Sequence, residues 1–149
     1  MEMKARLTED LKRSLRSGDK LRTSVIRLLT AVIKNREVEK RGPLSEAEVI
    51  QAISASCKQR QDSIEQYRQG GRQDLVEKET AELAILKGYL PAPFDPQELQ
   101  AMIRAAIQES RATSVKEMGK VMGLLMPRVT GRADGKVVSN LVREALSKA

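Results

Sequence analysis

Apolar residues recur at helical spacing along most of the 149-residue chain. Leu7, Leu11 and Leu15 are four residues apart, which places them along one edge of a helix. A second set of apolar residues is spaced at short helical steps: Val25, Leu28, Leu29, Val32 and Ile33. Regular alternation of apolar and polar residues, which indicates a β-strand, is not sustained anywhere. The pattern therefore predicts an all-α protein.

Polar and glycine-containing stretches predict where the N-terminal helices begin and end. A Ser-Gly-Asp stretch ends the first helix, and its last residue, Asp19, is a suitable N-cap for the second. The second helix is expected to end before Gly42–Pro43. Ser45 and Glu48 have the spacing of a capping box and open a third helix. Gly70–Gly71 separates this helix from a fourth.

A cluster of prolines divides the chain. Three prolines fall within residues 91–96, and a helix cannot continue through them. We therefore expect an N-terminal domain of about four helices over residues 1–90, a hinge at 91–96, and a three-helix tail domain over 91–149.

The tail carries its own start and stop signals. Asp95 as N-cap and Pro96 at the first helical position open the fifth helix. Ser114 and Glu117 have the spacing of a second capping box and predict the start of the sixth helix. Pro127 is expected to end that helix, and the seventh follows a glycine-containing loop.

Three polar residues fall on apolar stripes: Asn35, Arg60 and Glu79. Because buried polar groups are normally paired, we expect Arg60 and Glu79 to pair across facing helices, with Asn35 nearby. This pair is interpreted as structural, and a functional pocket is the alternative. Glu77 and Glu82 extend the acidic run, but on a helix such residues point in several directions. No complementary nucleophile accompanies them, which disfavours catalysis.

Composition narrows the classes of function. The chain has no His and a single cysteine, Cys57, which excludes an internal disulfide, a usual zinc site and the Ser-His or Cys-His nucleophile pairs. We therefore expect no metal and no cofactor. The N-terminal residues lack an apolar signal core, and no apolar run reaches the roughly 20 residues of a membrane span. These features favour a reduced, cytoplasmic protein without a membrane partner.

The net charge of +7 favours acidic partners, above all nucleic acid. Residues 1–36 hold ten Lys or Arg against four Asp or Glu. Five of these cations are predicted to form a phosphate-facing surface: Arg13, Arg16, Lys20, Arg27 and Lys34. Aromatic residues are nearly absent, which disfavours base stacking and favours structured RNA recognised by shape and backbone.

The segment 118–136 combines positive charge with residues that weaken helices. Gly119 and Gly123 share one helix face and would let a neighbouring helix or a phosphate-sugar strand approach closely. The later glycines permit turns with positive φ, after which a helix N-terminus would offer free N–H groups to an anion. We predict an RNA-binding surface with these members: Lys120, Arg128, Gly131, Arg132, Gly135 and Lys136. The alternative is that the glycines serve helix packing and the cations are ordinary solvated side chains.

Several short stretches, in order and at consistent spacing, resemble the YqeY family. They are Ile33–Glu39, Lys58–Ile64, Gly71–Leu75, Lys78–Glu79, Tyr89–Pro91, Met118–Gly123 and Gly131–Gly135. This family comprises stand-alone relatives of the C-terminal region of the GatB subunit of the tRNA-dependent amidotransferase. The resemblance implies a helical domain followed by a small three-helix tail. It also implies contact with tRNA, because the matching region of the amidotransferase engages tRNA while the chemistry occurs elsewhere.

The GatB domain that activates the substrate with ATP and metal precedes the matching region, and nothing equivalent fits in this chain. The resemblance therefore implies a non-catalytic adaptor that binds tRNA or other structured RNA. One alternative is a protein-interaction module that assists an aminoacyl-tRNA or amidotransferase complex. Another is an accessory component of a carbon–nitrogen ligase that uses glutamine as amido-N-donor.

Overall fold

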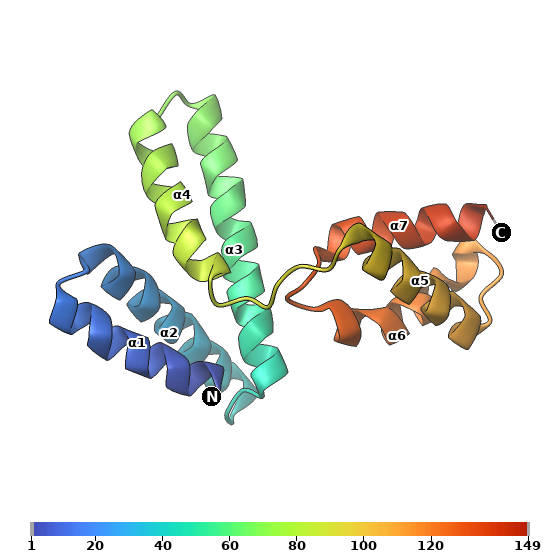
Figure 1. The fold of residues 1–149 in the computed structure, drawn as a ribbon, viewed down its shortest axis with the longest axis horizontal. Coiled ribbons are helices and arrows are strands. Elements are labelled where there is room, and N and C mark those ends of the chain that lie inside the picture. The colour runs from blue at the N-terminus through green and yellow to red at the C-terminus, as the bar shows by residue number, and fades with distance from the viewer. Residues whose placement is uncertain (1, 149) are drawn as a thin grey trace. The chain divides into compact units, whose positions relative to one another are not determined.

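The computed structural model describes residues 2–148, which form helices and connecting loops without a β-strand. The α-helices are α1 (Met3–Ser17), α2 (Lys20–Lys40), α3 (Glu46–Gln69), α4 (Gln73–Lys87), α5 (Pro96–Ser110), α6 (Met118–Val129) and α7 (Gly135–Ser147), with a 3₁₀ turn, η1, at Val115–Glu117 (Figure 1). The all-α prediction is confirmed. The chain divides into two compact units, one ending at Leu90 and the other beginning at Pro91. None of these helices is both long and apolar enough to cross a membrane.

The helix ends of the first unit follow local signals in the sequence. Gly18 has a left-handed backbone with φ 75° and ends α1, and the Asp19 carboxylate accepts a hydrogen bond from the backbone N–H of Arg22 at the start of α2. Ser45 and Glu48 form the predicted capping box at the start of α3, with both reciprocal hydrogen bonds present. These caps are confirmed because each depends on residues at most a few positions apart.

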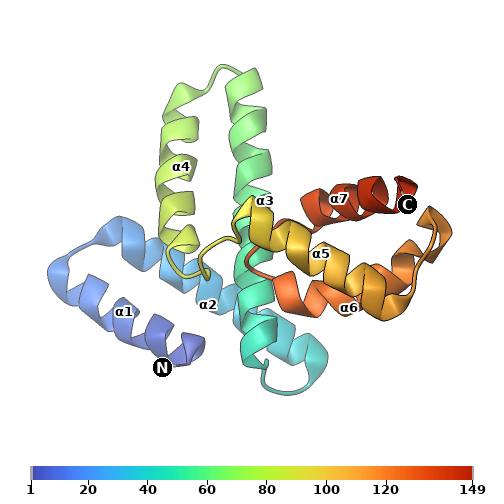
Figure 2. The same cartoon turned by 45° about the vertical axis from the view of Figure 1, so that its right-hand side comes forward.

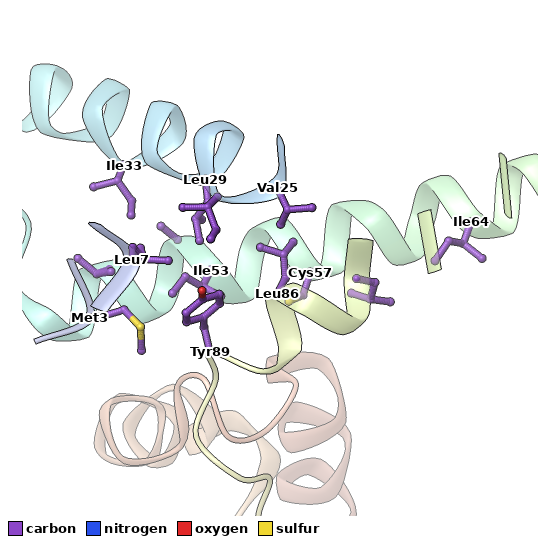
Figure 3. Close-up of a cluster of buried hydrophobic side chains, with 14 of the residues drawn as sticks. Met3, Leu7, Val25, Leu29, Ile33, Ile53, Cys57, Ile64, Leu86 and Tyr89 are labelled. Carbon is purple, nitrogen blue, oxygen red and sulfur yellow. The ribbon is translucent and has the colours of Figure 1, made fainter. Parts of the chain in front are cut away.

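The first unit consists of two antiparallel helical hairpins, α1–α2 and α3–α4 (Figure 1 and Figure 2). The long helix α3 packs most extensively against α4 and also contacts α1 and α2. Side chains from all four helices meet in one apolar core, where Leu7, Ile53 and Tyr89 lie together and Val25 lies near Leu86 (Figure 3). Burial of this apolar surface holds the hairpins together.

The core-facing side of α2 differs from the prediction. Val25, Ile26, Leu29 and Ile33 are buried, whereas Leu28 is 54% exposed. Asn35 is exposed as well, and the hydrogen bonds of Arg60 go to Glu79 and Glu82, so Asn35 does not join the buried polar group as expected. The apolar residues of α2 spread around more than one face, and the packing of α1, α3 and α4 selects the face that contains Ile26. On α1, Leu15 is likewise exposed, and Ser14 is buried instead.

Tyr89 joins the end of the first unit to its beginning. Its ring is buried, and its hydroxyl donates a hydrogen bond of 2.6 Å to the Asp10 carboxylate on α1. The Arg6 guanidinium lies 4.7 Å from the centre of the ring. Burial and the Asp10 carboxylate raise the pKa of Tyr89 to about 12. The residues just before Pro91 are therefore fixed onto α1 by contacts that are remote in sequence.

The tail unit packs α5, α6 and α7 around a separate apolar core that includes Ile103, Leu125 and Val142. Asp95 and Pro96 open α5 as predicted. The predicted box at Ser114 is wrong, because the chain enters η1 there and the Glu117 carboxylate accepts from the N–H of Thr113 instead.

Pro127 does not end α6. The helix continues through it to Val129. The missing N–H of a proline costs one hydrogen bond, and in the last turn of a helix few further bonds depend on it.

Candidate nucleic-acid interface

A largely buried charged cluster links α3 to α4. The Arg60 Nη1 lies 3.1 Å from the Glu79 carboxylate, which confirms the predicted pair on facing helices. Arg60 also forms an ion pair with Glu82, whose side chain is only 6% exposed. The sequence interpretation missed this second partner, although Glu82 follows Glu79 by three residues and therefore shares its helix face. The three groups satisfy one another, which supports a structural role.

Cys57, one turn before Arg60 on α3, is buried. Burial raises the pKa of the Cys57 thiol, which keeps it protonated, and Lys87 and Arg60 only partly oppose this effect. Among residues 2–148, no group of three or more acidic or Cys side chains is placed to hold a metal ion.

The two arginines of the predicted tail surface make contacts inside the tail. Arg128 pairs with Glu109 of α5, with 3.1 Å between Nη2 and the carboxylate. The Arg132 guanidinium stacks 3.7 Å from the centre of the Phe94 ring, and its Nε donates to the Ala92 carbonyl at 2.7 Å. Both side chains therefore have partners inside the tail, although the pair of Arg128 with Glu109 is exposed.

The N-terminus of α7 is already capped. The Asp134 carboxylate accepts a hydrogen bond of 2.8 Å from the backbone N–H of Lys136. One of the N–H groups that Arg128, Arg132 and Lys136 were expected to surround is therefore occupied by an acidic side chain. Binding of RNA by these residues stays a prediction. Lys136 and Lys120 are exposed, and neither has an ion-pair partner within residues 2–148.

The four glycines of the tail have different roles. Gly131 has φ 82°, the positive value that was predicted, whereas Gly135 does not. A Cβ atom on Gly135 would lie 3.4 Å from the end of the Met126 side chain, which is an ordinary contact, so the packing there does not require a glycine. Gly119 and Gly123 are exposed, and a Cβ atom on either would meet nothing within 4 Å beyond its chain neighbours and the nearby backbone of its own helix. Close approach of a neighbouring helix at these two positions is therefore not seen within the described residues.

The basic residues of the first unit gather around the turn between α1 and α2. Five exposed cations without a hydrogen-bonding or ion-pairing partner among residues 2–148 lie on these helices: Arg13, Arg16, Lys20, Arg27 and Lys34. A hollow of about 660 Å³ opens at the turn, with Arg13 and Arg16 in its lining together with Ser17 and Arg22. A second hollow of about 490 Å³ has Lys20 and Arg27 in its lining. Lys34 lines neither hollow and lies further along α2.

The two acidic residues at the first hollow are already used by the protein. Asp10 accepts the hydrogen bond of Tyr89 described above. Asp19 caps α2, and it lies 3.6 Å from the Nε of Arg22. Neither carboxylate is therefore paired with Arg13 or Arg16. The positive charges of these two arginines remain available to an anionic ligand.

The positive charge is local to this end of the unit. Residues 1–36 hold ten Lys or Arg against four Asp or Glu, whereas residues 37–90 hold eight against ten. The rest of the first unit is therefore slightly acidic, and an anion approaching it is steered towards α1 and α2.

Comparison with known proteins identifies relatives in fungi. A protein of Pyrenophora tritici-repentis named "Altered inheritance of mitochondria protein 41, mitochondrial" is 32% identical over 145 residues, which cover 95% of this chain and 79% of that protein. Proteins of the same name from Lachancea thermotolerans and Eremothecium gossypii are 41% and 34% identical. Those matches cover 58% and 73% of this chain, but only 46% and 61% of the relatives.

The names of these relatives correct one expectation. All three are named as mitochondrial proteins, and this finding overturns the expectation of a cytoplasmic location. Neither these names nor the family description states a catalytic activity. A family profile described as "Yqey-like protein" matches residues 4–146, which is nearly the whole chain, and the chain therefore belongs to the YqeY family.

Proposed function

We propose that this chain binds structured RNA, with tRNA as the first candidate, and that it acts as an adaptor without catalysing a reaction itself. One observation carries the proposal: Arg13 and Arg16 line an open hollow at the α1–α2 turn, and no carboxylate of the described chain pairs with them.

The chemistry of the hollow suits a phosphate backbone. Arginine presents a planar fork of donors that matches phosphate oxygens, and Ser17 adds a hydroxyl group in the same lining. The chain has only three aromatic residues, and of these Tyr89 is buried in the core. Stacking of single-stranded bases is therefore disfavoured, and contacts to a folded RNA through its backbone are favoured.

The tail is a weaker candidate for the main contact. Arg128 and Arg132 would have to leave Glu109 and Phe94 before they could bind phosphate. Lys120 and Lys136 remain available, and we propose that they provide a secondary contact.

A tRNA titration followed by fluorescence anisotropy over a series of salt concentrations tests the proposal. The variant Arg13→Gln/Arg16→Gln removes two charges from the hollow without removing buried atoms. We expect weaker binding and a salt dependence whose slope falls by about one for each lost phosphate contact. The matched control, Lys58→Gln/Lys78→Gln, removes two exposed charges from α3 and α4 and should bind like the parent.

Two results would contradict the proposal. If the parent protein does not bind tRNA or another folded RNA at low salt, the adaptor function is wrong. If both variants lose the same affinity, only the net charge matters and the hollow is not the site.

A further inference from the structure

Helix α2 has a second regular face, which points away from the core. Val25, Leu29 and Ile33 point from α2 into the first unit (Figure 3). On the other side, six exposed residues follow alternating steps of three and four: Leu21, Ser24, Leu28, Ala31, Asn35 and Val38. We call these six residues the α2 outer face. Their spacing is that of the a and d positions of a coiled coil.

The a positions of the α2 outer face are Leu21, Leu28 and Asn35, and Val38 is the large apolar residue among its d positions. Leu21, Leu28 and Val38 are 37%, 54% and 76% exposed, so a substantial apolar surface meets water. Asn35 continues the row of Leu21 and Leu28 at seven-residue steps. A single Asn at such a position is the usual device for setting the register of a paired helix. The pattern therefore indicates a helix that pairs with another helix.

One flank of this face carries one sign of charge. The residues that precede each a position, at position g of the heptad, are Lys20, Arg27 and Lys34. All three are exposed, and none has an ion-pair partner among residues 2–148. At position e, on the other flank, Val25 is buried, Val32 is partly buried, and Glu39 near the end of α2 is exposed. A partner helix would therefore meet three cations at position g and a single carboxylate, Glu39, at the far end of position e.

A hollow marks the N-terminal end of the α2 outer face. Leu15 from α1 and Leu28 from α2 line it, together with Lys20 and Arg27. The volume of about 490 Å³ is sufficient for a large apolar side chain. The hollow thus combines an apolar wall with cations, which suits an apolar anchor residue flanked by carboxylates.

We propose that the α2 outer face docks an amphipathic helix of a partner protein, with apolar residues at its a and d positions and Asp or Glu beside them. A second copy of this chain fits poorly. An antiparallel pair would set Lys20, Arg27 and Lys34 against the same cations. A parallel pair would set Lys20 and Arg27 against the covered Val25 and Val32, and only Lys34 would meet a carboxylate, that of Glu39. This inference concerns a different set of residues from Arg13 and Arg16 and does not depend on RNA binding.

A synthetic helical peptide tests the docking surface. The probe has three heptads with Leu at a and d, one Asn placed to meet Asn35, and Glu at e and g. A second peptide has Lys in place of every Glu. We expect saturable binding of the Glu peptide to the full-length chain by fluorescence anisotropy, and no binding of the Lys peptide.

Two variants localise the contact. Leu28→Ser/Val38→Ser removes exposed apolar groups and should weaken binding at least about tenfold. The matched control, Val115→Ser/Val137→Ser, removes exposed valines from the tail and should bind the peptide like the parent. Arg27→Glu/Lys34→Glu should reverse the preference and favour the Lys peptide.

The remaining outcomes overturn the proposal. Failure of the Glu peptide to bind, or equal binding by parent and Leu28→Ser/Val38→Ser, means that this face does not dock such a helix. If sedimentation shows a dimer that depends on Leu28, the occupant is a second copy. If anionic phosphatidylserine vesicles bind through Leu28 while the peptide does not, the face meets a lipid surface.

One variant distinguishes this proposal from RNA binding. Arg13→Gln/Arg16→Gln should lose tRNA binding and bind the peptide like the parent.

Discussion

The α1–α2 turn and the segment between α6 and α7 have similar sequences, with arginines and lysines beside glycines and a helix-capping Asp. The tertiary structure treats them differently. In the tail, Arg132 lies on Phe94 and Arg128 pairs with Glu109. At the α1–α2 turn, Arg13 and Arg16 line an open hollow and have no acidic partner in the described chain.

The difference shows that a basic segment is a candidate site only when its charges remain uncompensated after folding. Arg132 reaches a carbonyl group 40 residues earlier in the chain. By contrast, the acidic residues near Arg13 have other partners: Asp10 accepts a hydrogen bond from Tyr89, and Asp19 caps the N-terminus of α2. Arginines can therefore be sorted into those that stabilise the fold and those that are free to bind, and the following predictions test that division.

The largest effect is expected for an arginine that the fold requires. Arg60→Met removes the shared partner of Glu79 and Glu82 and leaves two carboxylates at a largely buried site. We expect the free energy of unfolding to fall by about 3–5 kcal/mol, because an uncompensated buried charge is costly. Denaturant unfolding followed by circular dichroism measures this loss.

Two further variants sharpen this prediction. Glu79→Ala should cost less than Arg60→Met, because Arg60 keeps its pairing with Glu82. Arg13→Ala should leave the free energy of unfolding nearly unchanged. Equal losses in Arg60→Met and Arg13→Ala would remove the distinction between structural and free arginines.

The second effect is a pH dependence of stability, which arises from the hydrogen bond between Tyr89 and Asp10. The pKa of Tyr89 is about 12 in the folded protein, above the ordinary value of 10, because its phenol is buried and donates to Asp10. The stabilisation from this bond is therefore complete below pH 10 and is lost as the pH rises from 10 to 12. A shift of this size corresponds to about 3 kcal/mol in the free energy of unfolding.

Unfolding measured from about pH 8 to pH 12 tests this dependence. In Tyr89→Phe the loss above pH 10 should be smaller than in the parent, whereas Tyr67→Phe should keep it. An identical pH profile for the parent and Tyr89→Phe would show that the Asp10 carboxylate is not held by Tyr89.

The third effect is specific to the tail. Arg132→Ala removes the stacking on Phe94 and the hydrogen bond to Ala92, and we expect a loss of about 1–2 kcal/mol in the stability of the tail. Arg128→Ala breaks only an exposed pair with Glu109 and should cost less than about 1 kcal/mol. Hydrogen exchange of the α5–α7 amides measures both. Faster exchange in Arg128→Ala than in Arg132→Ala would contradict the assignment.

The smallest effect is expected for RNA binding by the tail. Lys120→Gln/Lys136→Gln removes the two tail cations that have no described partner. Affinity for tRNA should fall less than it does in Arg13→Gln/Arg16→Gln, and the salt slope should change by at most about two. Anisotropy titrations of both variants in parallel decide the order. A larger loss in the tail variant would move the main contact from the α1–α2 turn to the tail.

The two compact units lead to a prediction about independent folding. Separate apolar cores lie on either side of the Pro91–Pro96 stretch. We predict that residues 1–90 and 91–149 each fold as an independent domain. Expression of each fragment, followed by circular dichroism, would test the domain boundary drawn from the prolines.

The sequence alone determined the helical class and most helix ends of this protein. Asp19, Ser45 and Asp95 cap their helices as predicted, because a cap depends on backbone groups two or three residues away. Two predicted helix boundaries are wrong. Ser114 leads into a 3₁₀ turn instead of capping α6, and Pro127 is accommodated in the last turn of α6 instead of ending it.

Only the tertiary structure decided which face of each helix is buried and which cations remain free. Leu28 and Leu29 have the same side-chain chemistry, yet Leu29 is buried and Leu28 is exposed. Glu82 forms an ion pair with Arg60, and Arg132 stacks on Phe94. The partners in these contacts are 22 and 38 positions apart in the chain. Burial and charge pairing depend on the distances between such segments, whereas periodicity and capping depend on immediate neighbours. The helices could therefore be predicted from the sequence, but the candidate site at the α1–α2 turn could not be ranked above the tail without the fold.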